Sequence, residues 1–228
     1  MVKFKFVPEA KQFTADMNTL LNGTICNNAR LITQIDDGGQ AQISLAGKIN
    51  DPDDPRMNCV PVRIGNENPT LYVGVQINLE PDRSGEFLMV RSSVMMLAAD
   101  SCGERELLHY DYERNKEHGY PEAHVQVKAA SADWDAALAG RDKPLHRLHL
   151  PVGGRRFRPT LEDVIEFLIV EKLAKGRDGW EGVLEKSRQE FQEIQLRAAV
   201  RNYPKVAVKV LQRLGYEITE PPDDDKLL

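Results

Sequence analysis

The feature that most constrains the fold of this chain is a series of short segments, between residues 29 and 128, in which apolar and polar side chains alternate. A period of two is typical of strands that bury one face. The connections between the segments are short and rich in Asp, Asn, Gly and Pro, which favour turns. Because parallel strands need long crossovers, these connections predict an antiparallel meander. The expected strands are residues 29–35, 40–49, 60–64, 71–79, 87–97, 106–114 and 124–128.

Helical periodicity flanks this region on both sides. Residues 8–22 place apolar side chains three and four positions apart, and a glycine follows as a helix stop. Towards the C-terminus, Thr160 with Asp163 three positions later predicts the capped start of a helix that ends at Gly176. Further helices are expected at residues 131–138, at residues 180–202 and from Pro204 onward.

These patterns predict an α+β fold, in which an antiparallel sheet carries an N-terminal helix and a C-terminal three-helix segment packed on it. We expect a single domain over residues 1–220, with the sheet in residues 29–128 and mostly helical structure in residues 131–215. Residues 221–228 are polar and acidic, which predicts a disordered tail.

Composition and standard motifs exclude several classes of function. No run approaches the roughly eighteen apolar residues of a spanning helix, and the first residues lack a secretion signal, so no membrane association is expected. The three cysteines are far apart and show no disulfide or metal spacing, which favours the cytoplasm. A net charge of −5 restricts any nucleic-acid binding to a local patch. Without a P-loop, a dinucleotide-binding glycine pattern or a nucleophile elbow, no cofactor is expected.

The histidines are the least random feature of the chain, because all five lie between His109 and His149. Strand alternation places His109 and Asp111 on one face of residues 106–114, with Tyr110 and Tyr112 on the other.

If residues 106–114 and 124–128 pair as a hairpin with their apolar side chains on the core side, His109, Asp111 and His124 share one polar face. Two imidazoles near a carboxylate can act as acid and base, with Asp111 orienting one ring. The same set could bind a divalent metal, but no established ligand spacing is met, so a metal site is not expected. The alternative interpretation is the solvated side of a half-buried sheet.

A basic stretch, residues 141–158, is the second candidate feature. It holds six Arg and Lys residues against one acid, a formal +5 inside an acidic chain. Arg155, Arg156 and Arg158 precede the predicted helix start, where guanidinium groups and a helix N-terminus favour phosphate. The alternative is that these arginines pair with acids elsewhere in the chain.

Residues 107–114 (LLHYDYER), the histidine strand after them, and Phe157 followed by residues 161–167 (LEDVIEF) resemble the TumE-like bacterial toxins. That family has a Tyr-Asp strand, a His-x-His strand and a closing helix after an aromatic residue. The resemblance covers roughly residues 71–170, in a chain about twice as long as those toxins. This chain has residues 124–126 (HVQ) where the family has two histidines. The resemblance implies a toxin–antitoxin or defence context and a nucleic-acid target.

Three functional hypotheses follow. The first is a cytoplasmic, toxin-like or defence-associated protein acting on RNA or a nucleotide, with His109, Asp111 and His124 as catalytic residues. Tyr110 or Tyr112 would bind substrate if it faced outward, and Arg155, Arg156 and Arg158 would hold phosphate. The second is a non-catalytic module that binds a protein through the helix at residues 180–202. The third is a metal-assisted hydrolase that uses the same His and Asp residues. The oligomeric state is left open.

Overall fold

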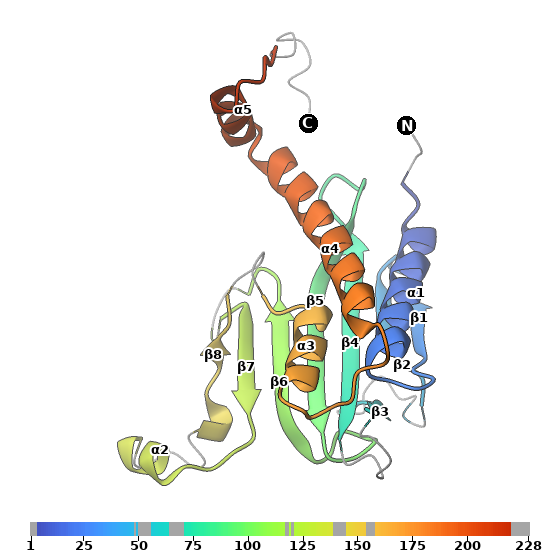
Figure 1. Cartoon of the computed structure of the whole chain (residues 1–228), viewed down its shortest axis with the longest axis vertical. Coiled ribbons are helices and arrows are strands. Elements are labelled where there is room, and N and C mark those ends of the chain that lie inside the picture. Colours follow the sequence, from blue (N-terminus) through green and yellow to red (C-terminus); the bar gives the residue numbers. More distant parts are fainter. Residues whose placement is uncertain are drawn as a thin grey trace. The chain divides into compact units, whose positions relative to one another are not determined.

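The computed structural model of this chain describes residues 4–47, 49, 56–63, 71–116, 119, 121–138, 145–153 and 158–219. It confirms the α+β class, with an antiparallel sheet, an N-terminal helix and C-terminal helices (Figure 1). The chain divides into two compact units, Met1–Ser187 and Arg188–Leu228, which are described separately. The acidic tail predicted at residues 221–228 lies outside the described residues.

One sheet is formed by the strands of the described residues, eight in all, and every pairing is antiparallel. Its order is β1-β2-β4-β5-β6-β7-β8, and β3 pairs with β4 along the edge that β2 also uses. The strands are β1 (Leu31–Ile35), β2 (Ala41–Leu45), β3 (Cys59–Pro61), β4 (Tyr72–Pro81), β5 (Leu88–Ala98), β6 (Glu106–Glu113), β7 (Ala123–Val127) and β8 (Leu150–Pro151).

Each predicted strand has a counterpart in this sheet, although β2 ends at Leu45 rather than at residue 49. The two-residue strand β8 was not expected, and neither was the short 3-10 helix η1 (Leu145–Arg147) before it. Their segments are too short and too rich in Pro and charge to show a period.

One face of the sheet carries the hydrophobic core, and helices α1 (Phe6–Thr24) and α3 (Leu161–Val170) pack against it (Figure 1). Leu21 from α1, Ile43 from β2 and Val75 from β4 meet Ile165 and Leu168 from α3 in a single buried cluster. The apolar members of the strands alternate with polar residues that point to the opposite face. Burying one face therefore leaves a polar face on the other side of the sheet.

Two asparagines of α1 hydrogen-bond to the backbone at the start of β1. Asn18 donates to the carbonyl of Leu31 at 3.0 Å and accepts from the Leu31 amide at 2.7 Å. Asn22, one turn later, makes the same pair of bonds with Ala29. The side chains thus satisfy backbone groups at the edge of the sheet that another strand would otherwise be needed to pair.

Helix α3 begins as predicted, with a capping box in which the Thr160 hydroxyl and the Asp163 carboxylate bond to each other's backbone amides. The prediction that this helix continues to Gly176 was wrong, because it ends at Val170. Lys172 has a φ of 60°, a left-handed conformation that stops a helix. The apolar pattern continues past the helix end because Ala174 is still buried in the core.

The remaining helices are α2 (Ala132–Ala137), α4 (Trp180–Asn202) and α5 (Pro204–Arg213). Within the first unit, α4 buries Leu184, and its Ser187 hydroxyl donates to Glu162 of α3 at 2.5 Å. In the second unit, α4 and α5 expose apolar side chains, including Ile194, Leu196 and Val210. Among the helices that the structure describes, none has the length and apolar character needed to span a bilayer.

Asp100 holds the turn between β5 and β6, and its replacement by alanine is expected to lower the free energy of unfolding by about 1–2 kcal/mol. Its carboxylate accepts backbone N–H bonds from Cys102 at 3.0 Å, Glu104 at 3.1 Å and Arg105 at 2.6 Å. Although burial opposes ionisation, these bonds hold the pKa of Asp100 at about 2.

Because the folded-state pKa of Asp100 lies below its ordinary value of 3.8, its stabilising effect is present above about pH 4 and is lost as the pH falls towards 2. Urea unfolding of the parent and of Asp100→Ala at several pH values measures this difference. Asp37→Ala, in the exposed hairpin turn between β1 and β2, is the control. A difference between parent and Asp100→Ala that stays constant from pH 7 to pH 2 would contradict the assignment.

Candidate functional site

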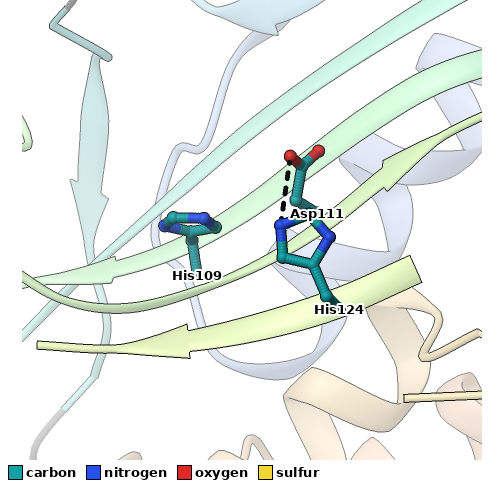
Figure 2. Close-up of side chains that lie close together, drawn as sticks. All are labelled: His109, Asp111 and His124. Atoms are coloured by element: carbon teal, nitrogen blue, oxygen red, sulfur yellow. Dashed lines mark ion pairs between the residues drawn. The ribbon is translucent and has the colours of Figure 1, made fainter. Parts of the chain in front are cut away.

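The hairpin of β6 and β7 brings together the residues predicted to share a polar face. Asp111 pairs with His124 across the two strands, and His109 pairs with Gln126. The faces are those predicted from the apolar side chains, because Tyr110 pairs with Val125 on the opposite face. Figure 2 shows the His124 ring facing the Asp111 carboxylate, with the His109 ring beside them.

His124 is the most enclosed member of the group, with 1% of its surface exposed. Its Nδ1 lies 3.1 Å from the carbonyl oxygen of Pro121, and its Nε2 lies 3.6 Å from Oδ2 of Asp111. A carbonyl oxygen only accepts, so Nδ1 carries the proton and Nε2 carries the lone pair. Burial lowers the pKa of His124 below 6.5, against the opposing effects of Pro121 and Asp111, so the ring is neutral at neutral pH.

His109 is held by Glu106, whose Oε1 lies 2.5 Å from Nδ1 of the ring. Burial opposes ionisation of Glu106, but the bond from His109 and the charge of Lys128, 3.6 Å away, hold its pKa below the ordinary value. An ionised carboxylate only accepts, so His109 also donates through Nδ1, which leaves Nε2 as the nitrogen that can exchange a proton or bind an ion. The His109 and His124 ring centroids are 6.3 Å apart.

Glu106 was missed by the sequence analysis because simple alternation places it on the face opposite His109. The pairing of β5 with β6 shifts by one residue, so that Leu97 faces Leu108 while Ala98 faces Glu106. A bulge of this kind interrupts the alternation of side chains, so that the residue on the N-terminal side of the bulge here turns to the other face of the sheet. Glu106 therefore joins the face of His109, and the sequence carried no signal for the shift.

His149 is the second residue that the sequence analysis did not assign to the site. It directly precedes β8, which pairs with β7 so that Pro151 faces His124. The His149 ring packs at an angle of 61° on the His124 ring, with the centroids 4.7 Å apart, and its Nε2 accepts from Gln126 at 3.1 Å. The separation of three between His146 and His149 was a weak signal, and only the pairing of β8 places His149 here.

Of the other predicted substrate-binding residues, the three that the structure describes, Tyr110, Tyr112 and Arg158, lie away from this group. Tyr110 and Tyr112 alternate to the core face, where Tyr112 is buried and burial raises the pKa of Tyr110. The Arg158 guanidinium lies 4.2 Å from the centroid of the Tyr112 ring and stacks on it, so Arg158 is on the same side of the sheet as Tyr112. Arg155 and Arg156 lie outside the described residues.

An open polar cleft of about 430 Å³ adjoins the group, because Asp111 belongs to both. Its lining comes from the polar face of β4, β5 and β6 and from the residue before β2: Gln40, Asn78, Arg91, Ser92, Val94, Asp111 and Glu113. Arg91 donates to Gln40 at 3.0 Å. Arg91 thus lines the same cleft as Asp111, whereas the arginines predicted for this role lie in residues 141–158.

Two kinds of chemistry fit this arrangement. Imidazole nitrogens with lone pairs beside a carboxylate can move protons, and they can also bind a metal ion. His109, Asp111 and His124 each offer a ligand atom, and these atoms all lie within 4.8 Å of one another.

Comparison of the chain with known protein families, with curated proteins and with solved structures gave no match.

Proposed function

We propose that this chain is a toxin-like or defence-associated cytoplasmic protein that cleaves a phosphoester bond in RNA or in a nucleotide. The reaction is placed at His109, Asp111 and His124, which we call the His/Asp centre. The observation that carries the proposal is the β6–β7 register, which sets Asp111 opposite His124 and puts both imidazoles on one side of the sheet. Loose resemblance of the chain to TumE-like toxins supports the biological setting.

The proton roles follow from the hydrogen bonds of the two rings. His124 has its Nε2 lone pair directed towards Asp111, and the carboxylate stabilises the imidazolium that forms when His124 takes a proton from the attacking hydroxyl. His109 is held at Nδ1 by the Glu106 carboxylate, and we assign it the other role, in which its protonated ring donates a proton to the leaving oxygen. No metal ion is required in this scheme.

The polar face beside the His/Asp centre supports an extended polar substrate. Val94 and Met96 of β5 face Asp111 and His109, and next to them the same face carries amide and hydroxyl side chains on β5, β4 and β2, where Asn78 donates to Ser92 at 2.9 Å. Amide groups can bond to the edges of unstacked bases. Arg91, in the same cleft as Asp111, is placed to contact a phosphate.

Replacing Asp111 with asparagine is expected to lower the rate of cleavage about 100-fold, because the neutral amide no longer stabilises protonated His124. The assay uses purified chain with end-labelled single-stranded RNA and, separately, with nucleoside phosphates, and products are resolved by gel and by chromatography. Asp135→Asn, an exposed change on α2, is the matched control and should keep the parent rate. The proposal fails if the parent cleaves none of these substrates, or if Asp111→Asn cleaves them as fast as the parent.

A protein-binding role through α4 is the second candidate, and one observation favours it. Ile194, Leu196 and Val200 are exposed apolar side chains on this helix, at 57%, 63% and 44% of their surface. Such residues are common at binding surfaces. This role predicts that the chain keeps its biological effect when the His/Asp centre is removed, whereas the catalytic role predicts that the effect is lost.

A further inference from the structure

The geometry of the His/Asp centre points to a binding site for one divalent transition-metal ion. We propose that Nε2 of His109, the carboxylate of Asp111 and Nε2 of His124 are its protein ligands. This goes beyond the proposed function, because metal binding does not depend on which substrate the chain cleaves. It would also change the mechanism, since an ion that occupies both Nε2 atoms replaces the imidazoles as the group that activates a nucleophile.

The two imidazoles are oriented as metal ligands usually are. Each ring has its Nδ1–H committed to an oxygen acceptor, Glu106 for His109 and the carbonyl of Pro121 for His124. Histidines that bind metals nearly always make such a bond with the nitrogen that does not touch the ion, because it fixes both tautomer and ring orientation. Here it leaves Nε2 as the coordinating nitrogen of each ring, and that of His124 faces Asp111 at 3.6 Å.

The spacing of the ligand atoms also fits a single ion. Two ligands about 2.1 Å from an ion lie about 3.4 Å apart at a tetrahedral angle. Oδ2 of Asp111 and Nε2 of His124 are 3.6 Å apart, close to that separation. All three ligand atoms lie within 4.8 Å of one another, so a small rotation of the half-buried His109 or Asp111 side chain closes the set.

The types of ligand and their exposure indicate which ion fits and how it reaches the site. Two imidazoles with one carboxylate suit Zn²⁺, Fe²⁺ and related ions, whereas Mg²⁺ and Ca²⁺ favour oxygen ligands. His124 is buried and braced by the His149 ring, but the side chains of His109 and Asp111 keep 15% and 23% of their surface exposed. Three protein ligands with an open side leave positions for water or substrate, as catalytic metal sites require.

The test is a Zn²⁺ titration of the chelator-treated chain, followed by calorimetry and with a competing chromophoric chelator. We expect one ion per chain. His109→Ala and Asp111→Ala, which alter half-buried side chains, should each weaken binding by at least about 100-fold. Absorption of the Co²⁺-substituted chain should show a low-coordinate site with nitrogen ligands in the parent and lose that signature in both variants.

Glu106 provides a sharper variant, because it orients His109 without being a ligand. Glu106→Ala is expected to weaken Zn²⁺ binding about 10- to 100-fold while the stoichiometry stays at one ion per chain. Glu104→Ala, exposed and two residues earlier, is the matched control and should bind like the parent. Circular dichroism of each variant separates loss of ligands from loss of the fold.

The inference is overturned if the parent fails to bind Zn²⁺ at concentrations up to about 100 µM, or if His109→Ala and Asp111→Ala bind as tightly as the parent. Cleavage of RNA that is undiminished by excess chelator would overturn the change of mechanism and leave the acid–base scheme standing. Tight binding at these ligands without cleavage of any phosphoester would instead reject the proposed function and leave the metal site.

Discussion

Replacing both His109 and His124 with alanine is expected to lower cleavage of RNA or a nucleotide by about 10³-fold or more. Positioned acids and bases each contribute roughly 10²- to 10⁴-fold, and groups that act in one step are not additive when removed together. The double variant therefore should lose little more than the more damaging single variant. The measurement is the single-turnover rate of each single variant and of the double variant on the same labelled RNA.

Because His124 is buried, its truncation to alanine also removes packing, and two further variants separate the effects. His124→Gln keeps much of the volume but cannot exchange a proton near neutral pH, so it should be as inactive as His124→Ala and closer to the parent in stability. His146→Ala is the control: it removes another of the clustered histidines, one that lies in η1, and should keep the parent rate. A double variant that cleaves as fast as the parent would remove the His/Asp centre from the mechanism.

Replacing Leu168 with alanine is expected to lower the free energy of unfolding by about 3–5 kcal/mol. Leu168 is fully buried, with 0% of its surface exposed, where α3 meets the core face of the sheet. The loss combines the transfer of the removed methyl groups with the cost of the cavity that remains. Urea unfolding monitored by circular dichroism measures the difference from the parent.

Val170 on the same helix is the matched control, because 62% of its surface is exposed. Val170→Ala should change the free energy of unfolding by less than about 0.5 kcal/mol. Since α3 packs on the core face, Leu168→Ala should leave Zn²⁺ affinity and cleavage unchanged at temperatures where the variant is folded. Equal stability of the two variants would show that α3 does not pack on the sheet as described.

The strands and their pairing were predictable because one physical requirement sets both. Each strand buries one face, so its apolar residues recur with a period of two, and a slip of one residue would turn them to solvent. Because Tyr110 and Val125 must face the core, that requirement predicted that His109, Asp111 and His124 share the opposite face. The same rule explains why the two tyrosines are absent from the His/Asp centre.

The sequence by itself determined the α+β class, the antiparallel pairing of the sheet and the face that gathers two imidazoles and a carboxylate, because these follow from local periodicity and short turns. Only the tertiary structure decided what holds those groups. A bulge in β6 turns Glu106 towards His109, and the pairing of the short β8 lays His149 on His124. Neither event has a local pattern, because each depends on how one strand meets its neighbour rather than on the residues within it.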